Sequence, residues 1–326
     1  MSLKIIRAGI LDTVQDLGRR GYQHLGINPG GAADRFSAAL ANALLGNELN
    51  SPVLELHFPA ASLLFSKPAA VCITGADFSP TLNGEALPVG HPFIVAQGQS
   101  LRFLRPVAGA RCYVAVWNGL KADEWLGSHS THLKVGAGGW QGRPLRQGDE
   151  IPFSGEMHFP GDAHPSFRLL PWSYHAPVSS GEIEILPGRD WYELTIPAQE
   201  LVQNEAFFIT SQADRMGCRL SGKPLEAKSH EQMVSSGVSF GTVQLLPDGQ
   251  LMVLMADHQT TGGYPIVAQV NSTSLSLLAQ KKSGEELRFR LTELEEAEKT
   301  LYGQEKYLRE LKNACKLKMQ NFLHAY

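Results

Sequence analysis

Glycine and proline divide this chain into short segments, and that division most constrains its fold. The sequence holds 32 Gly and 19 Pro in 326 residues. The segments between them are short, and they are either apolar throughout or alternate between apolar and polar residues, which is typical of β-strands. We expect strands at residues 69–75, 92–96, 101–104, 111–117, 183–186, 243–246 and 251–255.

Two turn sequences support this interpretation. Asn83-Gly84 suits a two-residue hairpin turn and predicts a hairpin between two of the strands. Pro247-Asp248-Gly249 predicts a second turn, between 243–246 and 251–255. Closely spaced strands with few helices favour barrels or sandwiches over alternating strands and helices. We therefore expect a mainly β chain.

Three helices are expected. The first runs from Asp34 to Leu45, with Asp34 as N-cap and Gly46 as the stop. The second covers 197–203, where Pro197 suits a first turn. The third is a long amphipathic C-terminal helix, opened by a Thr292/Glu295 capping box. Its apolar stripe is Leu294, Ala297, Leu301, Leu308, Leu311, Cys315 and Phe322.

The stripe on the C-terminal helix favours docking on the protein's own body over docking on a partner. The intermediate seam positions, Gln304 and Lys318, are polar and weaken a coiled-coil interpretation. The length of the chain favours two domains. Residues 154–181 are rich in Pro, Gly and Ser and predict the boundary between them. We expect one domain at 1–165, a second at 180–292 and the helix at 293–326.

Composition excludes several classes of function. The net charge is −3 and the sequence pI about 6.4, which gives no reason to expect nucleic acid or an anionic membrane as a partner. No apolar run approaches the ~20 residues of a membrane helix, and no signal peptide is recognisable, so we expect a cytoplasmic protein. His129 and His132 have no Cys or carboxylate at ligand spacing, and no metal site is expected.

A run of polar residues directly after an apolar segment predicts a functional site. The apolar segment 251–256 reads as a buried strand, and hydrogen-bonding and titratable side chains follow it without interruption. Two glycines then allow a sharp turn or close approach to a ligand. This pattern favours a site over a plain turn. The run is Asp257, His258, Gln259, Thr260, Thr261, Gly262, Gly263 and Tyr264.

Other polar groups are candidates for the same site, each with a structural alternative. Arg215, beside Asp214, suits recognition of a carboxylate or carbonyl, but it equally suits a structural salt bridge. His258 can transfer protons near neutral pH, or it can simply order the loop. Near the N-terminus, Gln15 and Asp16 either hold the two halves together or line a cleft.

Two familiar catalytic patterns do not apply. The chain has neither a Walker A sequence nor a GxGxxG, so any ATP site is unconventional or lies on another chain. Gly237–Gly241 fits GxSxG, but a nucleophile elbow needs a helix after the serine. Residues 242–246 read as a strand instead, which argues against a Ser239 nucleophile.

Three long stretches carry a family resemblance. They are GILDTVQDLGRRGYQHLGINPGGAADRFSAALANALLGN, SQADRMGCRLSG and GTVQLLPDGQLMVLMADHQTTGGYPIVAQV, in that order. Together they resemble the allophanate hydrolase subunit 2 family, also called the biotin-dependent carboxyltransferase-like family. The resemblance runs from about Ile5 to the start of the C-terminal helix. It implies two tandem cyclophilin-like β-barrel domains.

The resemblance also implies a partner and an activity. The partner is a homologue of the family's subunit 1, joined in 5-oxoprolinase by a third subunit. The activity is ATP-dependent opening of 5-oxoproline to glutamate by the complex. An unstrained lactam needs carbonyl activation, which ATP could supply by phosphorylating the amide oxygen, with preorganised donors stabilising the charge that develops. Whether ATP binds this chain stays open.

Two other activities occur in relatives of this kind. One is non-catalytic regulation, in which the chain binds a kinase-inhibitor-like subunit 1. The other is transfer of a carboxyl group from carboxybiotin to urea. The chain has no biotin-attachment domain, and the biotin-like sequence Lys316-Leu317-Lys318-Met319 lies in the predicted helix rather than on a hairpin. We therefore expect no covalently bound biotin.

Carried over by position, the resemblance marks a set of site residues. Arg215 is assigned to a substrate carboxylate or carbonyl, and Asp257 or His258 to proton transfer. The expected substrate-binding residues are Asp214, Gln259, Thr260, Thr261, Gly262, Gly263, Tyr264, Gln15, Asp16 and Asp34.

Overall fold

The structure is a computed structural model that describes residues 2–155, 168–175, 181–228 and 233–324. Contacts divide the chain into two compact units. Unit 1 comprises Met1–Gly18, Asp34–Ala176 and Glu305–Tyr326, and unit 2 comprises Arg19–Ala33 and Pro177–Gln304. Much of the predicted boundary at 154–181 lies outside the described residues. The domain limits at 165, 180 and 292 stay a prediction.

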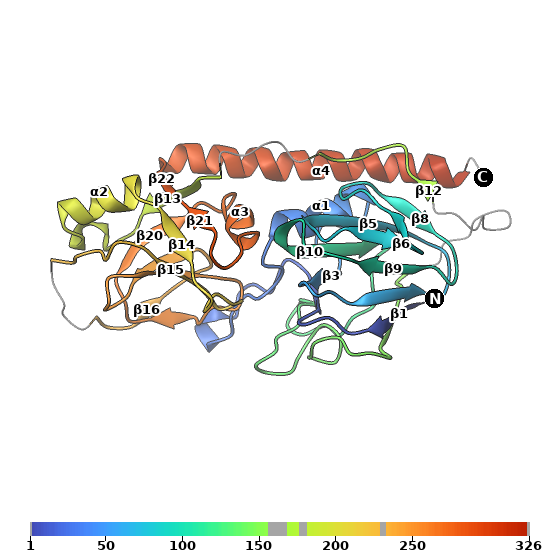
Figure 1. Cartoon of the computed structure of the whole chain (residues 1–326), viewed down its shortest axis with the longest axis horizontal. Coiled ribbons are helices and arrows are strands. Elements are labelled where there is room, and N and C mark those ends of the chain that lie inside the picture. The colour runs from blue at the N-terminus through green and yellow to red at the C-terminus, as the bar shows by residue number, and fades with distance from the viewer. Residues whose placement is uncertain (1, 156–167, 176–180, 229–232, 325–326) are drawn as a thin grey trace. The chain divides into compact units, whose positions relative to one another are not determined.

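Unit 1 contains two six-stranded sheets, and every strand pairing in them is antiparallel (Figure 1). The first runs β11 (Glu150–Pro152), β1 (Ser2–Arg7), β4 (Ser62–Phe65), β9 (Ser100–Phe103), β6 (Pro80–Leu82) and β7 (Glu85–Ala86). The second runs β12 (Arg168–Leu169), β8 (Phe93–Val95), β5 (Ala69–Asp77), β10 (Ala108–Val116), β3 (Val53–Leu56) and β2 (Thr13–Gln15).

Helix α1 (Arg35–Leu44) packs on β5 and β10 of the second sheet. The Asp34 side chain accepts a hydrogen bond from the Ser37 amide at 2.9 Å and so caps the helix, as predicted. Gly46 follows the helix with φ +71°, the left-handed conformation that ends helices. Leu40 and Leu44 are buried, so the apolar face of the helix closes one side of the sheet.

Unit 2 is built on one eight-stranded, nearly closed barrel sheet. Its order is β21 (Glu286–Leu287), β14 (Phe207–Ile209), β15 (Gly217–Ser221), β18 (Leu251–Leu254), β17 (Thr242–Leu245), β20 (Ile266–Val270), β13 (Ile183–Pro187) and β22 (Phe289–Leu291). Only β13 and β22 pair in parallel among these described strands. A separate ribbon pairs β16 (Ser236–Gly237) with β19 (Thr261–Gly262).

Unit 2 also contains several short helices. They are η1 (Gln23–Leu25), η2 (Trp191–Glu193), α2 (Ile196–Asn204) and α3 (Leu275–Ala279). α2 confirms the helix predicted at 197–203, and the Thr195 side chain accepts from the Ala198 amide at 3.4 Å to cap it. The core of the unit includes Ala33 from the N-terminal segment, packed with residues of the barrel strands.

The C-terminal helix α4 (Leu294–His324) begins two residues after Thr292, whose amide donates to the Ile185 carbonyl at 3.0 Å. Thr292 therefore continues strand pairing and lies too early to cap the helix. Leu308 and Cys315 are buried as the stripe predicts, and so is Ala297. Leu294 is 57% exposed, so its place in the stripe is wrong, and Met319 is a buried member that the stripe omitted.

Each strand expected from the sequence is present, with ends shifted by a few residues. The Pro247–Gly249 turn joins β17 and β18, with Leu245 opposite Leu251, as predicted. The Asn83-Gly84 hairpin also forms, but it joins β6 and β7, which the sequence did not single out. Asn83 and Gly84 both have positive φ, as a tight hairpin turn requires. The mainly β prediction is confirmed.

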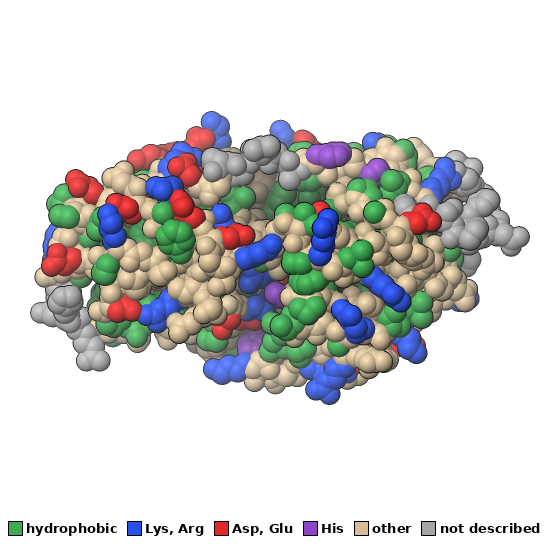
Figure 2. All heavy atoms as spheres, in the orientation of Figure 1, with side chains coloured by type: hydrophobic (Ala, Val, Ile, Leu, Met, Phe, Trp, Pro, Cys, Tyr) green, Lys and Arg blue, Asp and Glu red, His purple; other side chains and the backbone are tan. Residues whose placement is uncertain are grey.

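The surface carries mixed charge. Figure 2 shows basic and acidic side chains on the same face, among hydrophobic and polar ones. Within the described part of the chain, no helix is both long and apolar enough to span a bilayer. All four cysteines are buried.

Candidate functional site

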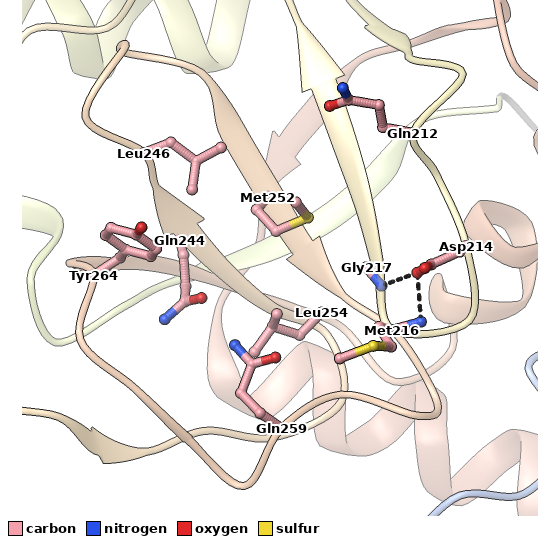
Figure 3. A pocket seen from close by; sticks show the side chains of 10 residues that line it. All are labelled: Gln212, Asp214, Met216, Gly217, Gln244, Leu246, Met252, Leu254, Gln259 and Tyr264. Atoms are coloured by element: carbon pink, nitrogen blue, oxygen red, sulfur yellow. Dashed lines mark hydrogen bonds between the residues drawn. The ribbon is translucent and has the colours of Figure 1, made fainter. Parts of the chain in front are cut away.

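A pocket of about 240 Å³ in unit 2 is the candidate site. β15, β17 and β18 and the loops beside them supply its walls (Figure 3). Its lining residues are Gln212, Asp214, Met216, Gly217, Gln244, Leu246, Met252, Leu254, Gln259 and Tyr264. In Figure 3, Gln212, Asp214 and Met216 lie on one side, Gln244, Leu246 and Tyr264 on the other, and Met252 and Leu254 between them.

Asp214 shapes one wall of the pocket. Its Oδ1 accepts hydrogen bonds from the backbone amides of Met216 at 2.7 Å and Gly217 at 3.0 Å. An Asp side chain that bonds its own backbone two and three residues ahead fixes a tight turn. The turn leads directly into β15 and holds Met216 at the pocket.

Gln244 is the one polar side chain of the pocket that is fully buried, with 1% of its surface exposed. It lies on β17, where all four residues are buried. Its Nε2 has no hydrogen-bond partner among the described residues. A Cβ at Gly262 would lie 2.4 Å from that nitrogen, so only glycine leaves room for the carboxamide. The predicted close approach at Gly262 is thus an approach to Gln244.

Arg215 and Asp257 form a largely buried ion pair next to the pocket. Arg215 is 6% exposed, and its Nε and Nη2 donate to the two Asp257 carboxylate oxygens at 2.7 and 3.0 Å. Nη2 also donates to the Gly31 carbonyl at 2.7 Å, and the Asp257 amide donates to the Arg215 carbonyl at 2.7 Å. These bonds tie the loop after β18 to the loop before β15. They match the structural alternative for Arg215, and its predicted role in substrate recognition stays a prediction.

His258 is fully buried beside this pair. Its Nδ1 lies 2.5 Å from the Gln259 carbonyl oxygen, and its amide donates to the Met255 carbonyl at 3.1 Å. Both contacts order the loop, and neither brings the ring to the pocket lining. Its predicted role in proton transfer is not tested by these contacts.

Asp16 organises a loop in unit 1. Its Oδ1 accepts from the Gly18 amide at 2.7 Å and from the hydroxyls of Ser128 at 2.7 Å and Ser130 at 2.5 Å. Its Oδ2 accepts from the His129 amide at 2.6 Å. Three of these four donors belong to residues 128–130 and hold that segment beside β2, so Asp16 has a structural role.

The other predicted residues of unit 1 are also held by internal contacts. Gln15 is buried, and its Nε2 donates to the Thr13 hydroxyl at 2.9 Å. Asp34 caps α1, and its amide donates to the Tyr113 hydroxyl at 2.8 Å. That hydroxyl donates in turn to Glu55 Oε2 at 2.8 Å, which satisfies a carboxylate buried in β3.

Asp12, next to these residues, carries a perturbed carboxyl group. Burial raises its pKa to about 6, and the nearby Glu55 adds to the effect. Hydrogen bonds from the amides of His57 and Ala61, at 3.0 and 2.7 Å, oppose the rise. These bonds join the Asp12 turn to the segment that leads into β4.

The structure brings only part of the predicted set to one place. Asp214, Gln259 and Tyr264 line the pocket, and Arg215, Asp257 and His258 brace the loops around it. Thr261 and Gly262 form β19, where Thr261 is exposed. Gln15, Asp16 and Asp34 belong to unit 1. Sequence reasoning missed the remaining lining residues: Gln212, Met216, Gly217, Gln244, Leu246, Met252 and Leu254.

The pocket has a distinct chemical character. Its described lining includes one carboxylate, three carboxamides and one phenol, with no Lys, Arg or His. Within the described residues, no three His, Cys, Asp or Glu side chains converge to hold a metal ion. The lining also does not suit a nucleoside triphosphate, whose phosphates call for basic side chains or a cradle of backbone amides.

Comparison with known proteins establishes the family. A family model for the carboxyltransferase domain, subdomain A and B, matches residues 25–291. The chain belongs to this carboxyltransferase domain family. It is 37% identical over 309 residues to the 5-oxoprolinase C subunit of Escherichia coli (strain K12), covering 95% of this chain and 97% of that protein. It is 33% identical to the 5-oxoprolinase C subunit of Haemophilus influenzae, covering 92% and 94%.

Relatives of a second kind are much longer than this chain. The urea amidolyase of Saccharomyces cerevisiae is 27% identical over 304 residues, and the chain spans only 16% of it. The crystal structure of K. lactis urea amidolyase superposes with a TM-score of 0.86 at 24% identity, over 95% of this chain and 20% of that one. The likeness confirms the fold class that the family resemblance implied.

Proposed function

We propose that this chain is a subunit of an ATP-dependent complex that hydrolyses 5-oxoproline to glutamate. The observation that carries the proposal is the match in length with two 5-oxoprolinase C subunits, of which the chain covers 97% and 94% at 37% and 33% identity. Such coverage leaves little of either relative without a counterpart here. The proposed partners are a subunit 1 homologue and a third 5-oxoprolinase subunit, acting in the cytoplasm.

The chemistry of the pocket supports a division of labour within this complex. A lining of carboxamides, thioethers and aliphatic groups suits a small amide and does not suit triphosphate. ATP is therefore assigned to the complex and not to this pocket. The contribution proposed for this chain is to bind and orient the amide, and the Arg215–Asp257 pair keeps the surrounding loops in place.

The test is glutamate formation by the reconstituted complex. This chain, co-purified with its neighbouring subunits, is incubated with 5-oxoproline and ATP, and glutamate is measured with and without the chain. Production that requires both the chain and ATP is expected. An assembled, folded complex that releases no glutamate would contradict the proposal and leave a non-catalytic regulatory subunit as the better interpretation.

A second candidate function is favoured by the urea amidolyase likeness. The family model and the TM-score of 0.86 to K. lactis urea amidolyase fit a carboxyltransferase component that acts on urea or a similar amide. The chain covers about a fifth of that enzyme, so biotin and its carboxylation would come from other proteins. Urea-dependent consumption of carboxybiotin by this chain, without glutamate production from 5-oxoproline, would favour this second function.

A further inference from the structure

The β16–β19 ribbon is a short covering on the barrel of unit 2. β16 and β19 contribute two residues each, and they pair in a single register, Ser236 with Gly262 and Gly237 with Thr261. An isolated two-stranded ribbon is marginally stable at best in water. The pairing of this ribbon therefore depends on its contacts with the barrel.

The apolar core of unit 2 does not extend into the ribbon. The buried core cluster includes Phe240 after β16, Ala256 before β19 and Val267 after β19, but none of the described residues 233–239 or 257–266. Segments with few buried apolar contacts open locally at a lower cost than the core does. The core residues on either side keep the ribbon attached to the barrel while it opens.

Gln244 lies directly under the ribbon. Its neighbours on β17, Val243 and Leu245, belong to the core, so the Gln244 side chain points to the opposite, outer face of the sheet. A Cβ at Gly262 would lie 2.4 Å from Gln244 Nε2, which places β19 over the carboxamide. The residue is 1% exposed, and its Nε2 has no hydrogen-bond partner among the described residues.

Ser236 is a second unsatisfied polar group under the ribbon. It pairs with Gly262, and directly paired residues of an antiparallel ladder direct their side chains to the same face. That face is the one that approaches Gln244, so the Ser236 hydroxyl also lies toward β17. Its Oγ is buried and has no partner within the described structure. Closing the ribbon removes water from both groups without replacing it, which opposes closure.

We propose that the β16–β19 ribbon is a flap that opens off β17 and closes over it. The flap consists of residues 233–238 and 259–264, and the structure holds its closed state. Burial of Val238 and Gly262 favours closure, and the two unsatisfied polar groups oppose it. This inference goes beyond the proposed function and does not depend on the activity of the complex.

The flap also forms part of the unit 2 pocket. Gln259 and Tyr264 line the pocket and belong to the flap, and Figure 3 shows Gln244 between them. Opening the flap moves both residues away from the pocket walls on β15 and β18, which belong to the barrel. The pocket is therefore complete only while the flap is closed, and the flap controls access to it.

The experiment is amide hydrogen exchange of the full chain, followed residue by residue by NMR. The reporter is the Val238 amide, which donates to the Thr260 carbonyl within the flap at 3.1 Å. Because a detached ribbon does not keep its pairing, opening exposes this amide to water. We expect it to exchange at least about a hundredfold faster than the amides of β17 and β18. Equally slow exchange at Val238 and in β17 would overturn the proposal.

Gln244→Leu tests whether the unsatisfied donor opposes closure. The change keeps the approximate size of the side chain and removes the donor, so it should slow exchange at Val238 about tenfold. The control is Gln203→Leu, the same change at an exposed position of α2, which should leave this exchange unaltered. Unchanged or faster exchange in Gln244→Leu would mean that Gln244 is satisfied in the closed state, by a bound water for example, and would overturn the proposal.

Ser236→Ala tests the other unsatisfied group. It removes the buried hydroxyl and should also slow exchange at Val238. Ser235→Ala is the matched control, because Ser235 is the neighbouring serine and is exposed. Neither substitution alters the two residues that set the intrinsic exchange rate of the Val238 amide. Equal effects of the two serine variants would contradict the closed geometry on which the flap rests.

Discussion

At the scale of single residues, the polar groups that stand out in the sequence serve mainly to hold loops. Asp16 collects four donors, and Asp214 fixes a turn through two backbone amides. Arg215 and Asp257 bind each other in a bidentate pair. The same chemistry that makes these side chains good ligands makes them good braces, so composition alone does not separate the two uses.

Removal of Arg215 should cost stability as well as any activity. Arg215→Ala leaves the Asp257 carboxylate and the Gly31 carbonyl without their main donor in a largely buried setting. Breaking a buried pair from one side typically costs about 3–5 kcal/mol. We expect a loss of this order in the free energy of unfolding, measured by urea denaturation.

The matched control is Arg219→Ala. Arg219 pairs with Asp248 on the surface, with 33% and 50% of the two side chains exposed. Exposed pairs contribute at most about 1 kcal/mol. Equal losses for the two variants would show that the Arg215–Asp257 pair does not brace the loops.

Asp12 should make stability depend on pH. Its pKa is about 6 in the folded chain against an ordinary 3.8, so the folded state binds its proton more tightly than the unfolded state does. Stability from this group is therefore greatest below about pH 4 and falls as pH rises through about 6. At about 1.4 kcal/mol per pKa unit, the loss amounts to about 3 kcal/mol.

The measurement compares the parent chain with Asp12→Asn by urea denaturation between pH 4 and 7. Other titrating groups affect both proteins alike, so the difference between the two unfolding free energies isolates Asp12. The parent should lose stability relative to the variant as pH rises. A difference that stays flat across this range would mean that Asp12 has an ordinary pKa.

The sequence located the loop of the pocket but not its walls. Gln259 and Tyr264 stand out because they belong to an unbroken polar run after a strand. Gln244 lies between Val243 and Leu245 in a segment dominated by apolar residues, and Met252 looks like ordinary core. The available signal was the single amide inside the otherwise apolar segment 243–246. Its position at the pocket, next to Gly262, depends on the tertiary fold, which spacing along the chain does not encode.

At the scale of elements, the local sequence pattern predicted the long, mostly apolar strands. β5 and β10 are long apolar strands, and both were predicted. β3, in which Glu55 interrupts the apolar residues, was not among the predicted strands. The structure explains the charge in this strand. Glu55 lies opposite Tyr113 in the strand register and accepts a hydrogen bond from the Tyr113 hydroxyl at 2.8 Å. A partner that is 58 residues away in sequence leaves no local trace.

The apolar positions predicted for α4 differ from its buried positions for a geometric reason. A strict seven-residue repeat assumes 3.5 residues per turn, whereas a straight helix has 3.6. Over three turns or more, the buried face therefore moves off the predicted positions. Leu294 is exposed at one end, and Met319, four residues after Cys315, is buried near the other. Spacings of four are what a straight helix on a globular surface requires.

Met319 should anchor the second half of α4. It is 1% exposed, whereas Leu317, two residues earlier, is 58% exposed. Truncating a buried Met to Ala costs about 2–5 kcal/mol, and an exposed Leu loses little. Met319→Ala should lower the melting temperature clearly, and Leu317→Ala should change it little. Similar behaviour of the two variants would show that this face of the helix does not pack.

Close packing around Gly46 also indicates that the second half of α4 packs against unit 1. A Cβ at Gly46 would lie 2.5 Å from the Lys316 Cα, and both residues belong to unit 1. Nearby, Lys312 Nζ contacts Glu48 at 3.0 Å, and Lys318 lies over the Trp172 ring. The helix is therefore a packed element of the unit, as the apolar stripe favoured.

At the scale of the whole molecule, each unit depends on chain segments that are distant in sequence. Unit 2 takes Arg19–Ala33 from near the N-terminus. Ala33 lies in its core, and the Gly31 carbonyl accepts from Arg215. Predicting this arrangement from the sequence would require knowing which half a short Gly-rich segment joins, and such a segment carries no periodicity.

An excised unit 2 should therefore need its N-terminal segment. A fragment of residues 177–304 should show weak amide protection in hydrogen exchange, because it lacks a core residue and an acceptor of the Arg215 pair. Attaching residues 19–33 through a flexible linker should restore protection, and a scrambled segment of the same composition should not. Full protection of the bare fragment would contradict this dependence.

The interleaved chain also fixes the order in which the protein can mature on the ribosome. Residues 19–33 emerge early and must wait until the strands of unit 2 have been made. The sheets of unit 1 emerge before the second half of α4, which completes that unit last. Until then the early strands of unit 2 lack their partners, a condition that favours aggregation and chaperone capture. We therefore expect the speed of translation through residues 177–304 to affect the yield of folded protein.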